Sequence, residues 1–228
     1  MNRVIYACDI GSIRAGHFAW ARVVPGQGTP HVSRSIDHLV TQLSEDAYEG
    51  SKSIAIGFES PPFMPVPAGS ASLGHGRENE GNRSMFAAVG ASVTTLGIHE
   101  AVWILRALRD TTHSRLQYTF DWTLWPGNVE APYLPVWEAF VAGAAHGRAH
   151  ICDAATAAMF FSDNENDLGR VNAVDAERPL CLIHAVALWA NWSAELSGFN
   201  GNCLVLKPEH AYEGDIDRGQ DSRDGVAN

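Results

Sequence analysis

Three acidic residues that are far apart in the chain stand where their carboxylates could act together. Asp9 and Glu59 each follow a short apolar run that is typical of a buried strand, and Asp153 opens an alanine-rich helical segment. Neighbouring strands bring side chains within about 5 to 7 Å of one another. A helix that begins over the same end of the sheet can aim a third acid into that space. Three carboxylates held there repel one another and cannot all stay ionised without a cation.

Carboxylate oxygens are hard ligands that select Mg²⁺ or Mn²⁺. Two such ions about 4 Å apart commonly cleave phosphodiester bonds, because one activates water and the other stabilises the leaving oxygen. The sequence therefore predicts Asp9, Glu59 and Asp153 as metal ligands and catalytic residues. Two of them have structural alternatives: Asp9 can begin the turn before Gly11, and Asp153 can be the N-cap of its helix.

Other residues are candidates for supporting roles. Glu138 lies in an apolar strand, so we expect it to pair with an arginine such as Arg83 or Arg148, or to be a fourth ligand. Arg77 and Arg83 lie in a polar loop, where they are either solvated or in contact with a phosphate group. His150 could carry protons near the acids.

The segment around His150 also allows a second metal chemistry. His146, His150 and Cys152 have a spacing that could hold zinc. Gly147 weakens a helix there, however, and Cys152 beside an alanine-rich helix is more simply a core residue. We therefore expect the histidines to serve the acids rather than a zinc ion.

The elements that must position these residues alternate between strands and helices. The alternation predicts an α/β fold, in which a hairpin from Arg3 to Val24 comes first and the apolar run Ser53–Phe58 is a strand buried in a parallel sheet. Asp37 is expected to cap the first helix. Further strands are expected at His31–Ile36, Leu134–Phe140 and Cys203–Leu206, and further helices at Met85–Leu108, Ala154–Phe161 and Ala173–Leu196.

Composition divides the chain into one domain and a tail. We expect a single domain over residues 1–208, with a lid-like insertion at about 60–84 because that stretch is rich in Pro, Gly and Ser. Residues 209–228 are acidic and poor in hydrophobic residues, which predicts a flexible tail.

Charge and cysteine usage limit the function classes. The formal net charge of −10 argues against a protein that coats nucleic acid by electrostatics alone. The four cysteines are far apart and form no C-x-x-C pair, which favours free thiols in a reducing cytoplasm. No run approaches about 18 apolar residues, so we expect no membrane partner.

The order of these features resembles a known family. It is similar to the predicted nucleases of the ribonuclease H-like fold that are grouped as a domain of unknown function of the DUF429 type. The resemblance covers about residues 3 to 161 and rests on the placement of acids. The stretches that carry it are the hairpin with Asp9, Ile54–Pro61, Arg77–Arg83, Val136–Glu138 and His150–Ala155.

The resemblance implies a fold, a site and a substrate. The fold would be a ribonuclease H-like mixed sheet, with an antiparallel hairpin plus parallel strands, flanked by helices. The family's acids match Asp9, Glu59 and Asp153, although the family commonly has Asp where this chain has Glu59. The implied substrate is nucleic acid, either DNA or RNA, and the implied cofactor is Mg²⁺ or Mn²⁺.

Two other functions remain open from the sequence. The acidic balance fits a non-catalytic scaffold or subunit of a larger assembly, which would act with a protein partner or as a homo-oligomer. The turn Asp9-Ile-Gly11-Ser12 also resembles the first phosphate loop of actin-like phosphotransferases. That group needs two such domains and well over 300 residues, so the length of 228 residues disfavours it.

Overall fold

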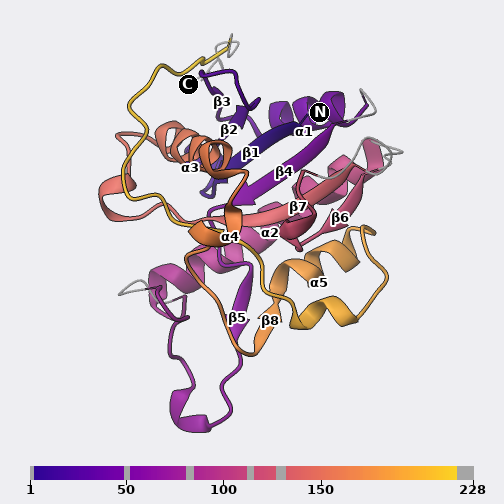
Figure 1. The fold of residues 1–228 in the computed structure, drawn as a ribbon, viewed down its shortest axis with the longest axis vertical. Coiled ribbons are helices and arrows are strands. Elements are labelled where there is room, and N and C mark those ends of the chain that lie inside the picture. Colours follow the sequence, from indigo (N-terminus) through magenta and orange to yellow (C-terminus); the bar gives the residue numbers. More distant parts are fainter. Residues whose placement is uncertain (1–2, 49–51, 81–84, 112–115, 127–131, 220–228) are drawn as a thin grey trace.

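The computed structural model describes residues 3–48, 52–80, 85–111, 116–126 and 132–219. Within these ranges a mixed sheet lies between helices (Figure 1), and its strands run in the order β3-β2-β1-β4-β7-β6, with β9 beside β7. The strands of this sheet are β1 (Arg3–Asp9), β2 (Ala19–Val23), β3 (His31–Ser33), β4 (Ser53–Phe58), β6 (Gln117–Thr119), β7 (Tyr133–Ala139) and β9 (Val205–Leu206). The α-helices are α1 (Ile36–Tyr48), α2 (Ala88–Thr111), α3 (His150–Asn164), α4 (Leu168–Val171) and α5 (Leu182–Trp189).

The sheet combines an antiparallel half with a parallel half. Strand β2 pairs antiparallel with both β1 and β3, whereas β1, β4, β7, β6 and β9 pair in parallel. All six residues of β4 are buried, as expected for a strand with both faces covered. The predicted α/β class, with a hairpin plus parallel strands flanked by helices, is confirmed.

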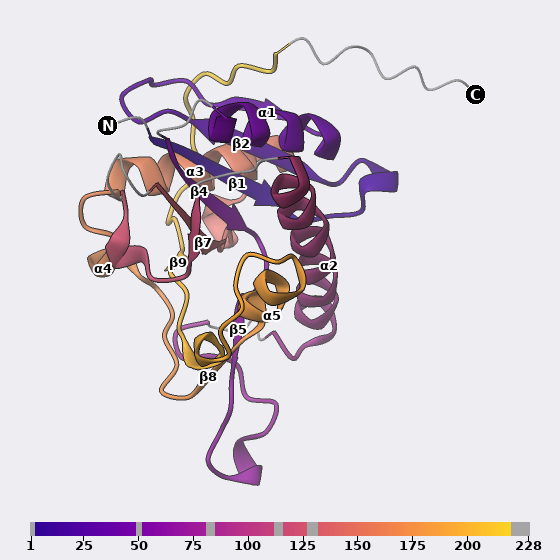
Figure 2. The same cartoon turned by 90° about the vertical axis from the view of Figure 1, so that its right-hand side faces the viewer.

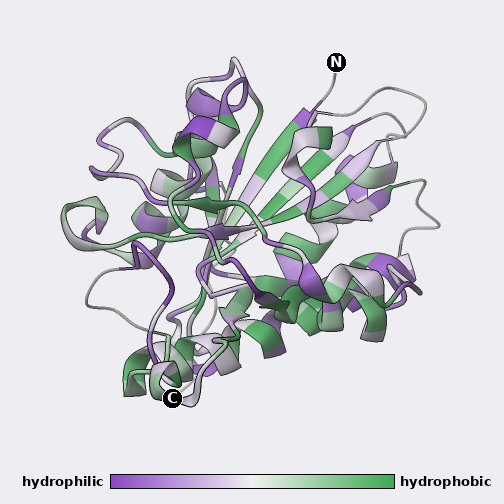
Figure 3. Ribbon diagram, turned by 60° about the horizontal axis from the view of Figure 1, so that its bottom comes forward, coloured by the Kyte–Doolittle hydropathy of each residue, from purple (hydrophilic) through white to green (hydrophobic). Residues whose placement is uncertain are grey.

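Helices cover both faces of the sheet because successive strand residues point to opposite sides. Val4, Tyr6 and Cys8 of β1 join a core cluster with residues of α1 and α2, and Ile5 and Ala7 join a second cluster with α3. Figure 2 shows α1 and α2 away from α3, with the strands between them. In Figure 3 the central strands carry long green, hydrophobic stretches, whereas many surrounding loops are purple.

A glycine in β4 allows the sheet to pack closely on the α3 side. A Cβ atom at Gly57 would lie 2.4 Å from Cε2 of Trp137, so only glycine leaves room for that indole ring. Trp137 is 1% exposed and its ring packs 5.0 Å from Phe161 of α3, measured between ring centroids. The absence of a side chain at Gly57 therefore allows Trp137 of β7 to pack between β4 and α3.

The prediction of one long helix over 173–196 is wrong. Pro179–Cys181 form strand β8, which pairs antiparallel with β5 (Phe63–Pro65), and α5 follows only from Leu182 to Trp189. Proline has no N–H group and is tolerated at the first residue of a strand, which is the place of Pro179 in β8. The apolar part of residues 173–196 therefore forms a short strand followed by a short helix.

The start of the first helix also differs from the prediction. Helix α1 begins at Ile36, and the Ser35 hydroxyl oxygen accepts a hydrogen bond of 3.2 Å from the His38 N–H group. Ser35, rather than Asp37, therefore satisfies an N–H group at this end. Asp37 lies within the first turn, where its charge still favours the helix dipole.

The segment predicted as a lid-like insertion at 60–84 projects from the body of the protein (Figure 1). Its outgoing arm is β5, which is tied to β8. Its returning arm ends at Arg77, whose side chain is fully buried and bonds to Glu138 of β7 and to Glu80. Residues 81–84, including Arg83, lie outside the described residues.

Residues 209–219 of the predicted tail at 209–228 make contacts with the domain. The Tyr212 N–H group donates to Thr156 Oγ1 of α3 at 3.0 Å, and Asp217 exchanges backbone hydrogen bonds with Pro30 and Val32. Ile216 and Tyr212 pack on the core cluster below α3. These hydrogen bonds and packing contacts connect residues 209–219 with the domain, although the stretch contains few hydrophobic residues. Residues 220–228 lie outside the described residues.

Helix α2 is the one helix of the described ranges whose length and mean hydropathy would permit a membrane crossing. One side of it is buried against the sheet and α5, and this side includes Gly97, Ala101, Leu105 and the acid Glu100. Core helices of globular domains have the same length and apolarity, so this feature is weak evidence about location.

Replacing Arg77 by methionine should destabilise the protein strongly. The substitution leaves Glu138 and Glu80 buried without their cation, which costs about 3 to 5 kcal/mol in comparable buried pairs. Urea unfolding measures the change in free energy. Arg106→Met is the matched control, because Arg106 pairs with Asp110 at the surface and its loss should cost less than about 1 kcal/mol. Equal losses for the two variants would contradict a structural role for the Arg77 ion pairs.

Candidate functional site

The parallel strands bring the predicted acids to one end of the sheet. Cys8, Phe58 and Glu138 are register partners across β1, β4 and β7, and Asp9 and Glu59 each lie one residue beyond that row. The Glu59 N–H group donates to the Cys8 carbonyl oxygen at 2.8 Å, which continues the pairing past the end of β4. Asp9 and Glu59 are therefore placed side by side by backbone pairing.

Asp9 and Glu59 are neighbouring carboxyl groups, and each affects the pKa of the other. Asp9 is 6% exposed, and its burial raises its pKa to about 6, although His150 works in the opposite direction. Burial and the charges of Asp9 and Asp153 raise the pKa of Glu59 well above its ordinary value. Two neighbouring carboxyl groups whose pKa values are both raised disfavour a second negative charge at this end of the sheet.

Asp153 lies near this pair, in the first turn of α3. Its Oδ1 accepts a hydrogen bond of 2.6 Å from the Gly147 N–H group, and its Oδ2 lies 3.1 Å from Nδ1 of His146. The helix begins at His150 and its N-cap residue is Ala149, so the alternative of Asp153 as N-cap is wrong. The charge of Asp153 nevertheless acts on both Asp9 and Glu59, which places all three predicted acids within electrostatic reach of one another.

The two histidines are partners of different acids. His150 Nδ1 lies 2.7 Å from Oδ2 of Asp9, and its ring also packs 5.3 Å from the ring of His17. His146 is bound to Asp153 instead. The His150 side chain is 41% exposed, so it connects the buried Asp9 with solvent. This arrangement fits the predicted proton-carrying role of His150 better than a shared zinc site.

Among the described residues, no three His, Cys, Asp or Glu side chains lie close enough together to coordinate a metal ion as they stand. The oxygens of Asp153 are occupied by Gly147 and His146. The Asp9–Glu59 pair still has the chemistry of a cation site, because it offers hard oxygen donors whose mutual repulsion a divalent ion would relieve. The donor set therefore fits Mg²⁺ or Mn²⁺, with Asp9 and Glu59 as its first members.

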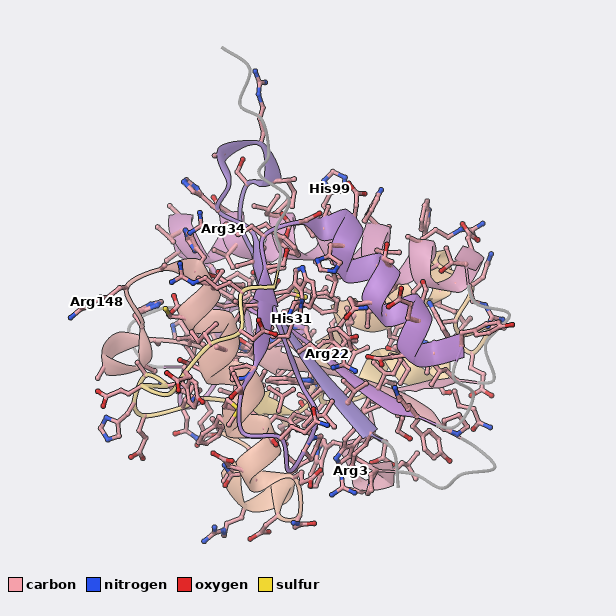
Figure 4. All side chains as sticks on the ribbon, turned by 90° about the horizontal axis from the view of Figure 1, so that it is seen from above. Arg3, Arg22, His31, Arg34, His99 and Arg148 are labelled. Carbon is pink, nitrogen blue, oxygen red and sulfur yellow. The ribbon has the colours of Figure 1, made fainter. Side chains whose placement is uncertain are left out.

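Glu138 and Arg77 form a structural pair beside the site. Two Arg77 nitrogens, Nη1 and Nη2, bond to Glu138 at 2.5 and 2.9 Å, and neither side chain is more than 3% exposed. The expectation of a salt bridge for Glu138 is met by Arg77 rather than by Arg148, which points outward at the periphery in Figure 4. Arg77 is thus neither solvated nor free to contact phosphate. Arg83 lies outside the described residues.

The sequence analysis missed Glu100, a buried acid on α2. It is 5% exposed, and neither carboxylate oxygen meets the geometry of a hydrogen bond with any described residue. Burial raises its pKa to about 7; the nearby Gly11 N–H group lowers it, and the charge of Asp9 raises it further. The available signal was an acid at helical spacing on the apolar face that includes Gly97, Ala101 and Ile104.

A glycine brings α2 close to the turn that carries Glu59. A Cβ atom at Gly97 would lie 2.2 Å from Cβ of Ser60, so the helix backbone reaches the turn directly. This contact places one turn of α2, with Glu100 in it, beneath the carboxyl pair. The site is thus built from both sides of the sheet, with histidines from the α3 side and a further acid from α2.

Replacing Glu100 by glutamine should remove a pH-dependent loss of stability. Because the pKa of Glu100 is raised from 4.5 to about 7 in the folded protein, its penalty is absent below pH 4.5, grows as pH rises from 4.5 to about 7 and is constant above that. In chelator, Glu100→Gln should match the wild type near pH 4 and exceed its unfolding free energy by about 1 to 3 kcal/mol near pH 8.

Urea unfolding at the two pH values measures this difference. Glu45→Gln is the matched control, because Glu45 is an exposed acid on α1 and its removal should change little at either pH. An equal effect of Glu100→Gln at both pH values would show that burial does not suppress the ionisation of Glu100.

The geometry of the site stands without support from relatives. Comparison with protein-family models, curated proteins and solved structures finds no match for this chain.

Proposed function

We propose that this protein is a divalent-metal-dependent nuclease that hydrolyses phosphodiester bonds, with Asp9, Glu59 and Asp153 as its acids. The observation that carries the proposal is the adjacent Asp9–Glu59 pair at the end of the parallel strands. Two neighbouring acids that repel each other contribute nothing to folding, whereas a cation held between them relieves their repulsion. Such pairs are concentrated at functional sites.

The arrangement of the elements supports a ribonuclease H-like fold for this nuclease. The sheet has an antiparallel hairpin, β1–β2, followed by the parallel strands β4 and β7, with helices on both faces. Two of the acids follow or end β1 and β4, and the third lies in the first turn of α3. This is the placement that the resemblance to the DUF429 type implies.

The residues of the site have distinct roles in this proposal. Mg²⁺ or Mn²⁺, when bound, would supply Lewis acidity to the phosphate and lower the pKa of a water molecule. Asp9 and Glu59 would hold the ion. Asp153 can join them only if it releases Gly147 or His146. His150, which bonds to Asp9 and reaches solvent, would carry a proton between the site and the surroundings.

The proposed substrate is nucleic acid, either DNA or RNA, and the proposed location is the cytoplasm. Cys181 and Cys203 support a reducing compartment, because their sulfur atoms lie 3.7 Å apart as free thiols in the buried core. The net charge of −10 means that the backbone phosphates contribute little attraction to the protein as a whole. Recognition of the nucleic acid must then depend on contacts close to the proposed catalytic site.

A non-catalytic scaffold is the second candidate. It is favoured by the absence of a preformed three-residue metal group from the described ranges, and by the histidine partners that Asp9 and Asp153 already have. In that case the acids and histidines would form structural pairs. Such a protein would act with a protein partner or as a homo-oligomer.

Replacing Asp9 by asparagine should abolish cleavage. The substitution removes one oxygen charge from the pair, and activity should fall by about 100-fold or more, since even the partners of metal ligands cost about 10 to 100-fold. The assay uses single-stranded and duplex DNA and RNA with Mg²⁺ or Mn²⁺. Asp37→Asn is the matched control, because Asp37 is exposed on α1, and it should cleave at the wild-type rate.

Titration with Mn²⁺ separates the two candidate functions. The nuclease should bind Mn²⁺ in the wild type and lose that binding in Asp9→Asn. Cleavage that survives in Asp9→Asn would remove Asp9 from the mechanism, and a wild type that neither binds Mn²⁺ nor cleaves would favour the scaffold.

A further inference from the structure

A cleft opens directly beside the carboxyl pair, on the α2 side. Its volume is about 530 Å³. It lies between the turn after β4, the beginning of α2 and the end of β7. Its walls are largely apolar, and the residues that form them next to Glu59 include Pro61, Met85, Val89, Val93 and Phe140.

Among the described lining residues of the cleft, the charged groups other than Glu59 are bonded to one another. Arg77 is its one cation among the described lining residues, and its side chain is fully buried. It already bonds to Glu138 and Glu80, which are themselves buried. Among the described lining residues, a phosphate group would therefore meet acids and apolar carbon rather than a free cation. The cleft is suited to an uncharged, largely apolar part of a ligand.

Glu59 connects this cleft with the proposed catalytic site. Its side chain lines the cleft, and backbone pairing places it beside Asp9. A group in the cleft thus lies next to whatever the acids hold. In a nucleic acid, the group next to a phosphodiester is a nucleoside, whose base is flat, uncharged and apolar on both faces. A volume of about 530 Å³ is in the usual range for sites that hold molecules of this size.

We infer that the cleft receives one unpaired base of the nucleic-acid strand whose phosphodiester lies at Asp9 and Glu59. This inference rests on the proposed nuclease function and narrows its substrate to single-stranded or locally unpaired nucleic acid. A base inside a duplex is stacked and paired, so it would have to leave the helix to enter the cleft. Because the net charge of −10 opposes binding of the backbone, base contact supplies the affinity that phosphate contacts cannot.

Binding of strands that differ only in their bases tests the inference. The probes are a short single-stranded oligonucleotide, a fully abasic strand of the same length and charge, and the duplex of the same sequence. Binding is measured by fluorescence anisotropy in chelator, so that neither metal nor cleavage is needed. The wild type should bind the intact single strand about 10-fold or more tightly than either other probe, as one base contact is worth about 1 to 3 kcal/mol.

A pair of helix variants assigns the preference to the cleft. Val93→Phe fills the cleft and should remove the preference for the intact strand. Thr95→Phe makes a similar change on the exposed side of the same helix and should keep it, because Thr95 does not line the cleft. Phe140→Leu is a second variant in case Val93→Phe does not fold, and it should weaken the preference by removing an aromatic wall.

Equal binding of intact and abasic strands by the wild type would overturn the inference, and so would a preference that survives in both Val93→Phe and Phe140→Leu. These outcomes differ from failure of the nuclease proposal, which is decided by Mn²⁺ binding and cleavage. A protein that cleaves abasic and intact strands equally would be a nuclease without this base site. A protein that prefers intact strands but neither binds Mn²⁺ nor cleaves would be a single-strand binder.

Discussion

The repulsion between acids at one end of the parallel strands is the constraint on which the rest of the structure depends. Parallel pairing of β1 and β4 places Asp9 and Glu59 side by side. Several of the acids nearby have a partner of their own: His150 for Asp9, His146 for Asp153 and a buried guanidinium for Glu138. A chain under selection for stability alone would use apolar residues here. The concentration of charge therefore argues for a purpose other than folding.

The two faces of the sheet contribute different chemistry to the same end. On the α3 side, the segment before the helix and its first turn supply histidines, which can move protons. On the α2 side, the helix supplies apolar walls and one unpaired acid, Glu100. Glu59 belongs both to the acidic site and to the lining of the apolar cleft. In the proposed nuclease, this division would separate a polar site for phosphate chemistry from an adjacent apolar site for recognition of a base.

The sequence predicted what depends on local patterns. The apolar runs before Asp9 and Glu59 indicated strands, and the alternation of elements indicated an α/β fold. What it could not predict depends on long-range pairing. The bond of Glu138 to Arg77 spans 61 residues, and the division of 173–196 required a partner strand at 63–65. Glu100 was missed because an acid among apolar helix residues is usually assigned to the solvent side. The positions of the acids on their strands and helix were thus easier to predict than their partners.

The path of residues 209–219 has a consequence for how the protein behaves in solution. Strand β3 is the last strand on its side of the sheet, and its outer main-chain groups would otherwise be open to pairing with another molecule. Asp217 occupies two of them, because its N–H group bonds to Pro30 and its carbonyl oxygen accepts from Val32. The chain thus caps its own sheet. A protein shortened before Asp217 would present a bare strand, which favours aggregation or exchange of strands between copies.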